Sequence, residues 1–405
     1  MENYLVFIMC IALIGALLDC LLDQYIVLQR QFYRFFFALI YVLFLIRFYY
    51  GQDIFSYVPH YETIASPAFL LSHPEQMRYE AGYELLCSVL HAWGAGYWWL
   101  TAVITTLYFA ALACFFHTLK RHRLFAFSAL ILLDYNLIYA QTRECLAVAF
   151  FIFMVLCLRN GRYVLALLTG VLTILSHKSG FIPVGVTLLG LPLLHMRQTA
   201  DGYKILLVLM LTILLVPVSR AGASLVAMLP LSASHIESIQ HHMLLGRQFQ
   251  IVAVVYLAVL FLLICWHRPQ EKNRYTWIAI ESLMGMAIIV CFYQYFNLLM
   301  RMRSFFLPMI IGYVISLVTD TERIKKVPYG MFLKQSVAAL MMVYWVHTTL
   351  SFERMTKQWH APVMKACTLL DLRHHSEKEI RDRQMKYAET FWREDYMRDK
   401  KYEIK

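Results

Sequence analysis

Charged residues are scarce in this chain of 405 residues. Asp, Glu, Lys and Arg make up 16% of it, whereas 60% of the residues are hydrophobic and 15% are aromatic. Soluble domains carry about 25% charged residues, so this shortage excludes a soluble globular protein. We predict an all-α polytopic membrane protein. The formal net charge of +11 does not indicate nucleic acid, because Lys and Arg gather in short clusters between apolar runs, as in cytoplasmic loops.

Motifs for metal, nucleotide and disulfide are also lacking. The nine cysteines lie singly, without a Cys-x-x-Cys pair, which excludes a zinc site of that type and a disulfide framework. There is no Gly-x-Gly-x-x-Gly and no Gly-x-x-x-x-Gly-Lys-Ser/Thr, so no nucleotide is expected. Asp, Glu and His show no dense metal-ligand spacing. We therefore predict a protein without metal or cofactor.

Long apolar runs are abundant and predict roughly twelve transmembrane helices in a membrane domain over residues 1–350. The runs are 4–22, 32–50, 98–117, 124–139, 143–158, 163–175, 181–194, 203–219, 251–266, 276–299, 304–318 and 331–350. The first run lacks the basic start and the small-residue cleavage site of a signal peptide, so we expect it to stay in the protein.

Basic turns alternate with the apolar runs, as the positive-inside rule requires. With Arg30 and Arg34 in the cytoplasm, the amino terminus and an outer loop at 51–81 face outward, followed by a partial or interfacial helix at 82–93. A second outer loop is expected at 220–249. Residues 351–405 form a charged, partly helical tail, which this topology places on the outer side.

Polar residues from distant parts of the sequence then meet at the outer ends of the helices. They are Arg47, Asp53, Glu80, Glu84, Arg143, Glu144, His177, Lys178, Arg301 and Arg303, with His235, His241, His242 and Arg247 from the second outer loop. Arg binds phosphate oxygens through two parallel hydrogen bonds, and a rim of low dielectric strengthens them. The set therefore suits a diphosphate head group.

Each of these residues also has a structural explanation. His177 could be a core histidine, Asp53 and Glu80 could only hold Arg47 or Arg78 in place, and Asp134 could be a proton relay or a structural hydrogen-bonding group. Asp134 lies too deep in its run for a surface site. Interfacial anchoring would account for Arg47, Arg143, Arg301 and Arg303.

The spacing of these residues resembles a known family. The pattern is Arg47, Gly51-x-Asp53-x-x-x-Tyr57-x-x-x-Tyr61, Glu80-x-Gly82-Tyr83-x-x-Leu86, Arg143-x-x-x-Ala147 and Ser176-His177-Lys178. It resembles the EpsG family of bacterial exopolysaccharide proteins, relatives of the Wzy polymerases. The likeness extends to about residue 320, with Ala81 and Gln52 where the family usually has Pro and Thr.

The resemblance implies polymerisation of undecaprenyl-diphosphate-linked oligosaccharide repeat units into capsular polysaccharide, exopolysaccharide or O-antigen. It implies a multi-pass bacterial inner (plasma) membrane protein with a fold related to the GT-C-like glycosyltransferases that use lipid-linked sugars. The expected partners are that lipid-linked oligosaccharide, the bilayer, and flippase, chain-length-regulating or export proteins, but no nucleic acid.

Polymerisation needs a base for the acceptor hydroxyl and cations for the departing diphosphate. The candidate bases are His177, Asp53 and Glu80. The candidates for binding the diphosphate or the glycan are Arg143, Arg47, Arg301, Arg303, Tyr57, Tyr61, Tyr83 and Lys178. Two alternatives stay open: a flippase or transporter of the lipid-linked oligosaccharide, and another membrane transferase such as a ligase or acyltransferase.

Overall fold

The computed structural model describes residues 4–22, 25–51, 53–195, 278, 281–282, 284–285, 296–318 and 367–403. The predicted outer loop at 220–249 and the runs at 203–219, 251–266 and 331–350 lie outside these residues. The chain forms two compact units. The first contains Met1–Ala149, Leu175–His177 and Val318–Lys405, and the second contains Phe150–Ile174 and Lys178–Leu317.

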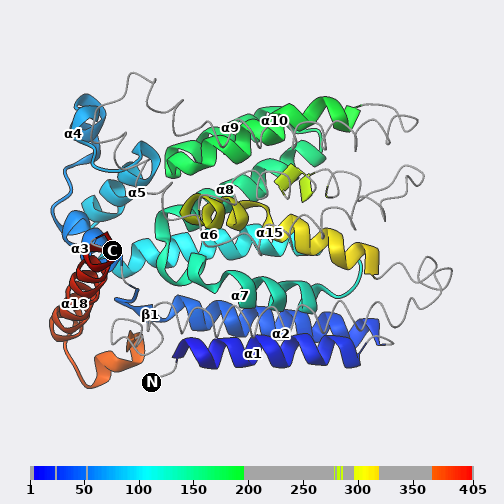
Figure 1. The fold of residues 1–405 in the computed structure, drawn as a ribbon, viewed down its shortest axis with the longest axis horizontal. Coiled ribbons are helices and arrows are strands. Elements are labelled where there is room, and N and C mark those ends of the chain that lie inside the picture. Colours follow the sequence, from blue (N-terminus) through cyan, green and yellow to red (C-terminus); the bar gives the residue numbers. More distant parts are fainter. Residues whose placement is uncertain are drawn as a thin grey trace. The chain divides into compact units, whose positions relative to one another are not determined.

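Four long helices form the body of the first unit and pack side by side (Figure 1). They are α1 (Tyr4–Leu21), α2 (Ile26–Leu45), α6 (Tyr97–His117) and α7 (Arg123–Ala140). Helices α2 and α6 are both long and apolar enough to cross a membrane. Helix α7 is interrupted at Asp134, which is buried and has a non-helical backbone.

Short helices gather at one end of these four helices, and most of them lie within the predicted outer loop at 51–81 (Figure 1). A two-residue strand, β1 (Arg47–Phe48), follows α2, and Gly51 then turns the chain with a φ of 85°. The segments after it are α3 (Ile54–Glu62), α4 (Pro67–Ser72), the 3-10 helix η1 (Pro74–Gln76) and α5 (Ala81–Ala92). Helix α5 thus occupies the segment where a partial helix is predicted.

The carboxy-terminal tail packs on this same end of the first unit. Its strand β2 (Cys367–Thr368) pairs with β1 in antiparallel register, Arg47 opposite Thr368 and Phe48 opposite Cys367. The 3-10 helix η7 (Leu369–Arg373) and the long helix α18 (Glu377–Glu403) follow. Helix α18 packs against α3. Two side-chain contacts join it to the loop: the Tyr49 hydroxyl donates a hydrogen bond to Glu377, and Arg381 forms an ion pair with Glu62.

The second unit is built from apolar helices with aromatic contacts. They are the later part of α8 (Thr142–Arg159), α9 (Tyr163–Ser176) as far as Ile174, η2 (Lys178–Gly180), α10 (Phe181–His195) and α15 (Phe296–Val318) as far as Leu317. Phe151 of α8 lies edge-on against Phe305 and Phe306 of α15, with ring centroids 5.5 and 5.4 Å apart. Such contacts add packing energy to the burial of apolar surface.

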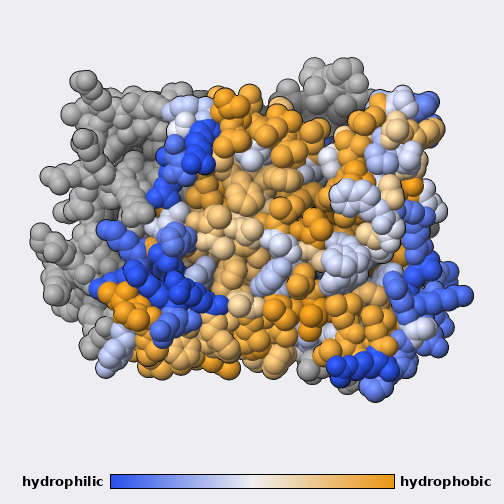
Figure 2. All heavy atoms as spheres, turned by 180° about the vertical axis from the view of Figure 1, so that it is seen from behind, coloured by the Kyte–Doolittle hydropathy of each residue, from blue (hydrophilic) through white to orange (hydrophobic). Residues whose placement is uncertain are grey.

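Hydrophobic side chains also cover much of the face drawn in Figure 2. On the face drawn in Figure 2 they dominate the middle, and hydrophilic residues gather toward its left and right edges. Val27 and Phe35 of α2 and Val164 of α9 are large, apolar and exposed. An apolar exterior is what helices facing lipid require, and the protein is mostly helical, as predicted. Twelve spans stay a prediction.

Candidate functional site

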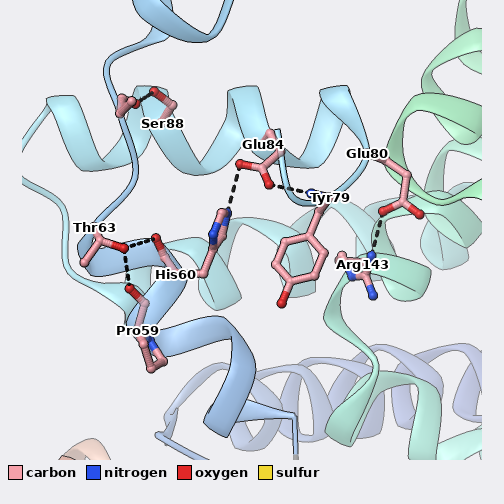
Figure 3. Close-up of polar contacts among 9 residues, drawn as sticks. Pro59, His60, Thr63, Tyr79, Glu80, Glu84, Ser88 and Arg143 are labelled. Carbon is pink, nitrogen blue, oxygen red and sulfur yellow. Dashed lines mark hydrogen bonds and ion pairs between the residues drawn. The ribbon is translucent and has the colours of Figure 1, made fainter. Parts of the chain in front are cut away.

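Arg143 and Glu80 form an ion pair at the end of the first unit where the short helices gather. Arg143 lies in the first turn of α8, and Glu80 directly precedes α5. Arg143 Nη1 lies 2.7 Å from Glu80 Oε2, and Arg143 Nε donates to the Tyr57 hydroxyl at 3.0 Å (Figure 3). Three predicted site residues from α3, α5 and α8 therefore meet directly. Glu80 holds Arg143, a partner that the structural alternative did not name.

The Arg143 guanidinium keeps donors for a ligand. Within the described part of the chain its hydrogen bonds use Nε and Nη1, so the two hydrogens of Nη2 have no protein acceptor there. The side chain is 21% exposed, compared with 8% for Glu80. Its Cζ lies 4.3 Å from the centroid of the Tyr79 ring. An Arg fixed by a carboxylate and an aromatic ring is preorganised to bind an anion.

Tyr57 has a protonated hydroxyl beside this cation. Burial raises the pKa of Tyr57, and nearby Asp53 raises it further, whereas Arg143 lowers it. The net pKa lies above the ordinary value of 10.0. At neutral pH the phenol therefore accepts a hydrogen bond from Arg143 and keeps its own proton for donation to another oxygen.

The Tyr79 ring is surrounded by the other members of the site. The Tyr57 ring meets it edge-on at 5.5 Å, and the His60 imidazole meets it edge-on at 4.8 Å. His60 Nε2 lies 2.9 Å from Glu84 Oε2, and Glu84 Oε1 accepts the backbone N–H of Tyr79 at 2.7 Å (Figure 3). One ring thus links a cation on α8 to a histidine–carboxylate pair between α3 and α5.

Gly82 allows the end of α9 to approach the start of α5. A Cβ at Gly82 would lie 2.9 Å from the Leu175 carbonyl oxygen, which is backbone and cannot move aside easily. Leu175 stands two residues before His177, which is buried. The missing side chain of Gly82 therefore lets the backbone at Leu175 lie against the start of α5.

The surroundings of Arg47 differ from those expected of an arginine that binds diphosphate. It is fully buried, and its guanidinium donates to the carbonyl oxygens of Phe44 and Ile138. The rings of Phe44, Tyr50 and Tyr139 lie within 5.4 Å of Cζ. In this structure Arg47 therefore joins α2 to α7 and does not meet solvent. A cation can be buried in this way because backbone carbonyls and aromatic faces replace water.

The other predicted residues of the outer loop have mixed surroundings. Tyr83 of α5 is fully buried, and its ring lies 5.9 Å from that of Tyr57, so it packs against the cluster. Tyr61 is also buried, and its hydroxyl donates to the Ala95 carbonyl at 2.7 Å. Asp53 is half-buried, directly before α3. Binding of glycan by these tyrosines stays a prediction.

Three predicted cations belong to the second unit. Lys178 is exposed in η2, whereas Arg303 is buried in α15, and Arg301 lies on the same helix. Their roles stay predictions. The candidate residues His235, His241, His242 and Arg247 lie outside the described residues.

The sequence pattern passed over three members of the cluster. His60 lies between Tyr57 and Tyr61 in the quoted motif, and its i,i+3 spacing from Tyr57 on one helix face was a usable signal. Glu84 was named among the polar residues but given no role, and Tyr79 was not selected because many tyrosines in this chain serve packing. In the described ranges no three residues among His, Cys, Asp and Glu group as metal ligands. Metal independence stays a prediction.

Comparison with known proteins gives one family. The family model described as the EpsG family matches residues 3–359, which is nearly the whole chain. No curated protein and no solved structure matches the chain.

Proposed function

This chain belongs to the EpsG family, whose members are membrane proteins, and from that premise we propose that it is a polysaccharide polymerase. The proposed substrate is an oligosaccharide repeat unit carried on undecaprenyl diphosphate. The reaction takes place at the extracytoplasmic face of the bacterial inner membrane, on a multi-pass fold related to the GT-C-like transferases. The observation that supports it most directly is the partly exposed Arg143, held by Glu80 and Tyr57.

The chemistry explains why such an arginine is needed. The hydroxyl of the acceptor unit attacks the anomeric carbon of the donor, the bond from that carbon to the diphosphate oxygen breaks, and the diphosphate leaves with the electron pair. Negative charge grows on the leaving group as the bond breaks. The free hydrogens of Arg143 Nη2 can bind its oxygens, and a guanidinium already fixed in place loses little freedom when it does so.

Glu80 acts in this scheme as a positioning residue for Arg143. A carboxylate 2.7 Å from a guanidinium is stabilised in its charged form, and this makes it a weaker base for the acceptor hydroxyl. Asp53 and His177, the other two predicted bases, remain candidates for taking the proton of the acceptor hydroxyl, and Glu80 is the weaker candidate. Tyr57 can donate its phenolic proton as a hydrogen bond to an oxygen of the substrate.

The test compares Arg143→Lys with the wild type in the native host and with purified protein. We expect Arg143→Lys to reduce chain elongation by roughly 10²-fold, because an ammonium cannot replace the planar fork that contacts Glu80, Tyr57 and the diphosphate together. Arg162→Lys is the matched control, since Arg162 is exposed beyond the other end of α8. Surface glycan length and protein abundance are the measurements.

The outcomes separate the possible functions. Deletion of the chain should remove long glycans and leave single repeat units at the surface. Repeat units that accumulate on the cytoplasmic side would indicate a flippase instead. Normal long chains from Arg143→Lys at normal abundance would remove Arg143 from the mechanism.

A further inference from the structure

His60 and Glu84 form a dyad that the proposed mechanism has not used. Glu84 is 1% exposed and His60 is 13% exposed, so a buried carboxylate holds an imidazole that reaches the edge of the protein. Glu84 Oε1 accepts the Tyr79 backbone N–H, and Glu84 Oε2 faces His60 Nε2. The Tyr79 N–H thus holds the Glu84 carboxylate in place, and the carboxylate in turn fixes the orientation of the His60 imidazole.

The hydrogen bond also sets the tautomer of His60. An ionised carboxylate only accepts hydrogen bonds, so Nε2 must carry the proton. Nδ1 then presents a lone pair, and within the described part of the chain it makes no hydrogen bond. A carboxylate that orients a histidine and stabilises its protonated form is the arrangement that general-base catalysis uses.

The dyad is close to the proposed anion-binding residue. The His60 ring centroid lies 4.8 Å from that of Tyr79, and Arg143 Cζ lies 4.3 Å from the same centroid. The distance from the His60 ring centroid to Arg143 Cζ therefore cannot exceed the sum of these two distances. Figure 3 shows the Tyr79 ring between the two groups. A donor diphosphate on Arg143 would have its reacting sugar within reach of an acceptor hydroxyl near His60.

We infer that His60 is the general base that takes the proton of the acceptor hydroxyl, and that Glu84 is its positioning residue. The inference rests on the proposed polymerase function. As the acceptor oxygen forms its bond to the anomeric carbon, its proton moves to His60 Nδ1, and the bond to the diphosphate breaks. The imidazolium that results is stabilised by the Glu84 carboxylate.

A structural role for the dyad makes a different prediction, because the same hydrogen bond also joins α3 to α5. His60→Gln separates the two roles, since a Gln amide can still donate to Glu84 but cannot act as a base. Glu84→Gln supplies a second test. Its amide carbonyl can still accept from Tyr79, but its NH₂ donates to Nε2, which forces the proton onto Nδ1 and removes the basic lone pair.

The experiment measures elongation of a short lipid-linked oligosaccharide by purified full-length protein. We expect His60→Gln and Glu84→Gln each to lower kcat by roughly 10²-fold to 10⁴-fold with little change in KM. His60→Ala should regain part of its activity when imidazole is added. The control is His73→Gln, the same substitution at an exposed position of the same loop, which should elongate normally.

Three results would count against the inference in distinguishable ways. Elongation at the wild-type rate by His60→Gln shows that the dyad is structural. Loss of kcat in His60→Ala without any gain from imidazole also overturns the role of His60 as base. Failure of the wild-type protein itself to elongate the oligosaccharide overturns the polymerase function and, with it, this inference.

Discussion

Among single residues, Tyr79 occupies the place where the two halves of the candidate site meet. Its ring lies over the Arg143 guanidinium and beside His60, and within the described residues its hydroxyl makes no hydrogen bond. The ring of Tyr79, and not its hydroxyl, should therefore determine how much this residue contributes to donor binding by Arg143. Cation–π contacts contribute about 0.5–2 kcal/mol, which corresponds to roughly 2-fold to 30-fold in binding.

We accordingly expect Tyr79→Phe to retain donor binding and Tyr79→Leu to weaken it by roughly 2-fold to 30-fold. Binding of a lipid-linked donor by the purified variants is the measurement. Affinities of both variants equal to that of the wild type would mean that the guanidinium does not depend on the ring. A loss with Phe as large as the loss with Leu would instead point to the hydroxyl.

The sequence allowed individual residues of the site to be predicted, but not which of them form pairs with each other. Arg143, Glu80 and Tyr57 were each selected by charge or by motif. The ion pair between the first two joins positions 63 residues apart, and nothing local specifies such a pairing. Arg47 illustrates the opposite case. An Arg at the end of an apolar run is equally compatible with a surface anchor, an anion site and the buried aromatic surroundings that it has.

At the scale of secondary-structure elements, Gly82 determines how closely α5 and α9 approach. A methyl group there would lie 2.9 Å from the Leu175 carbonyl oxygen and 3.0 Å from its carbonyl carbon. Relief of this contact would move Leu175, two residues before His177, away from the start of α5. Overpacking of this kind typically costs 1–3 kcal/mol.

We expect Gly82→Ala to lower the melting temperature and to reduce elongation. Thermal unfolding and glycan chain length are the measurements. The matched control is Gly185→Ala in α10, because a Cβ at Gly185 meets no atom of the described residues within 4 Å. A variant at Gly82 as stable and as active as the one at Gly185 would show that the close approach is unimportant.

The pairing of β1 with β2 could not be predicted from the sequence. The apolar run 98–117 predicted α6 to within one residue, because apolar composition and length determine a membrane helix. The run 32–50 was less accurate, because α2 begins six residues earlier and ends at Leu45, before β1. A strand of two residues has no periodicity to detect, and β2 stands in a segment of mixed charge. Only its partner β1 makes it a strand.

For the molecule as a whole, the pairing of β1 with β2 requires the tail and the candidate site to be on one side of the membrane. The two ends of α6 should lie on opposite sides, because this helix of 21 residues is long enough to cross. In a background without native cysteines, single cysteines at Ala92 and His374 should react with an impermeant thiol reagent from outside. A cysteine at Lys120 should not react.

All three of these positions are exposed, so access to the reagent depends only on the membrane. Reaction at Lys120 and protection at Ala92 would invert the topology and place the site in the cytoplasm. Opposite behaviour of Ala92 and His374 would contradict the packing of the tail on the outer loop.

The tail also affects when the protein becomes complete during synthesis. Tyr49, directly after β1, donates a hydrogen bond from its hydroxyl to Glu377 at the start of α18, and the two residues are 328 positions apart. At about 5–20 residues per second, ribosomes need roughly 15–65 s to make the chain between them. During that interval β1 has an unpaired edge and α3 lacks its contact with α18. A newly made copy therefore cannot complete the contacts of the loop that carries Tyr57 and His60 until residue 377 has also been made.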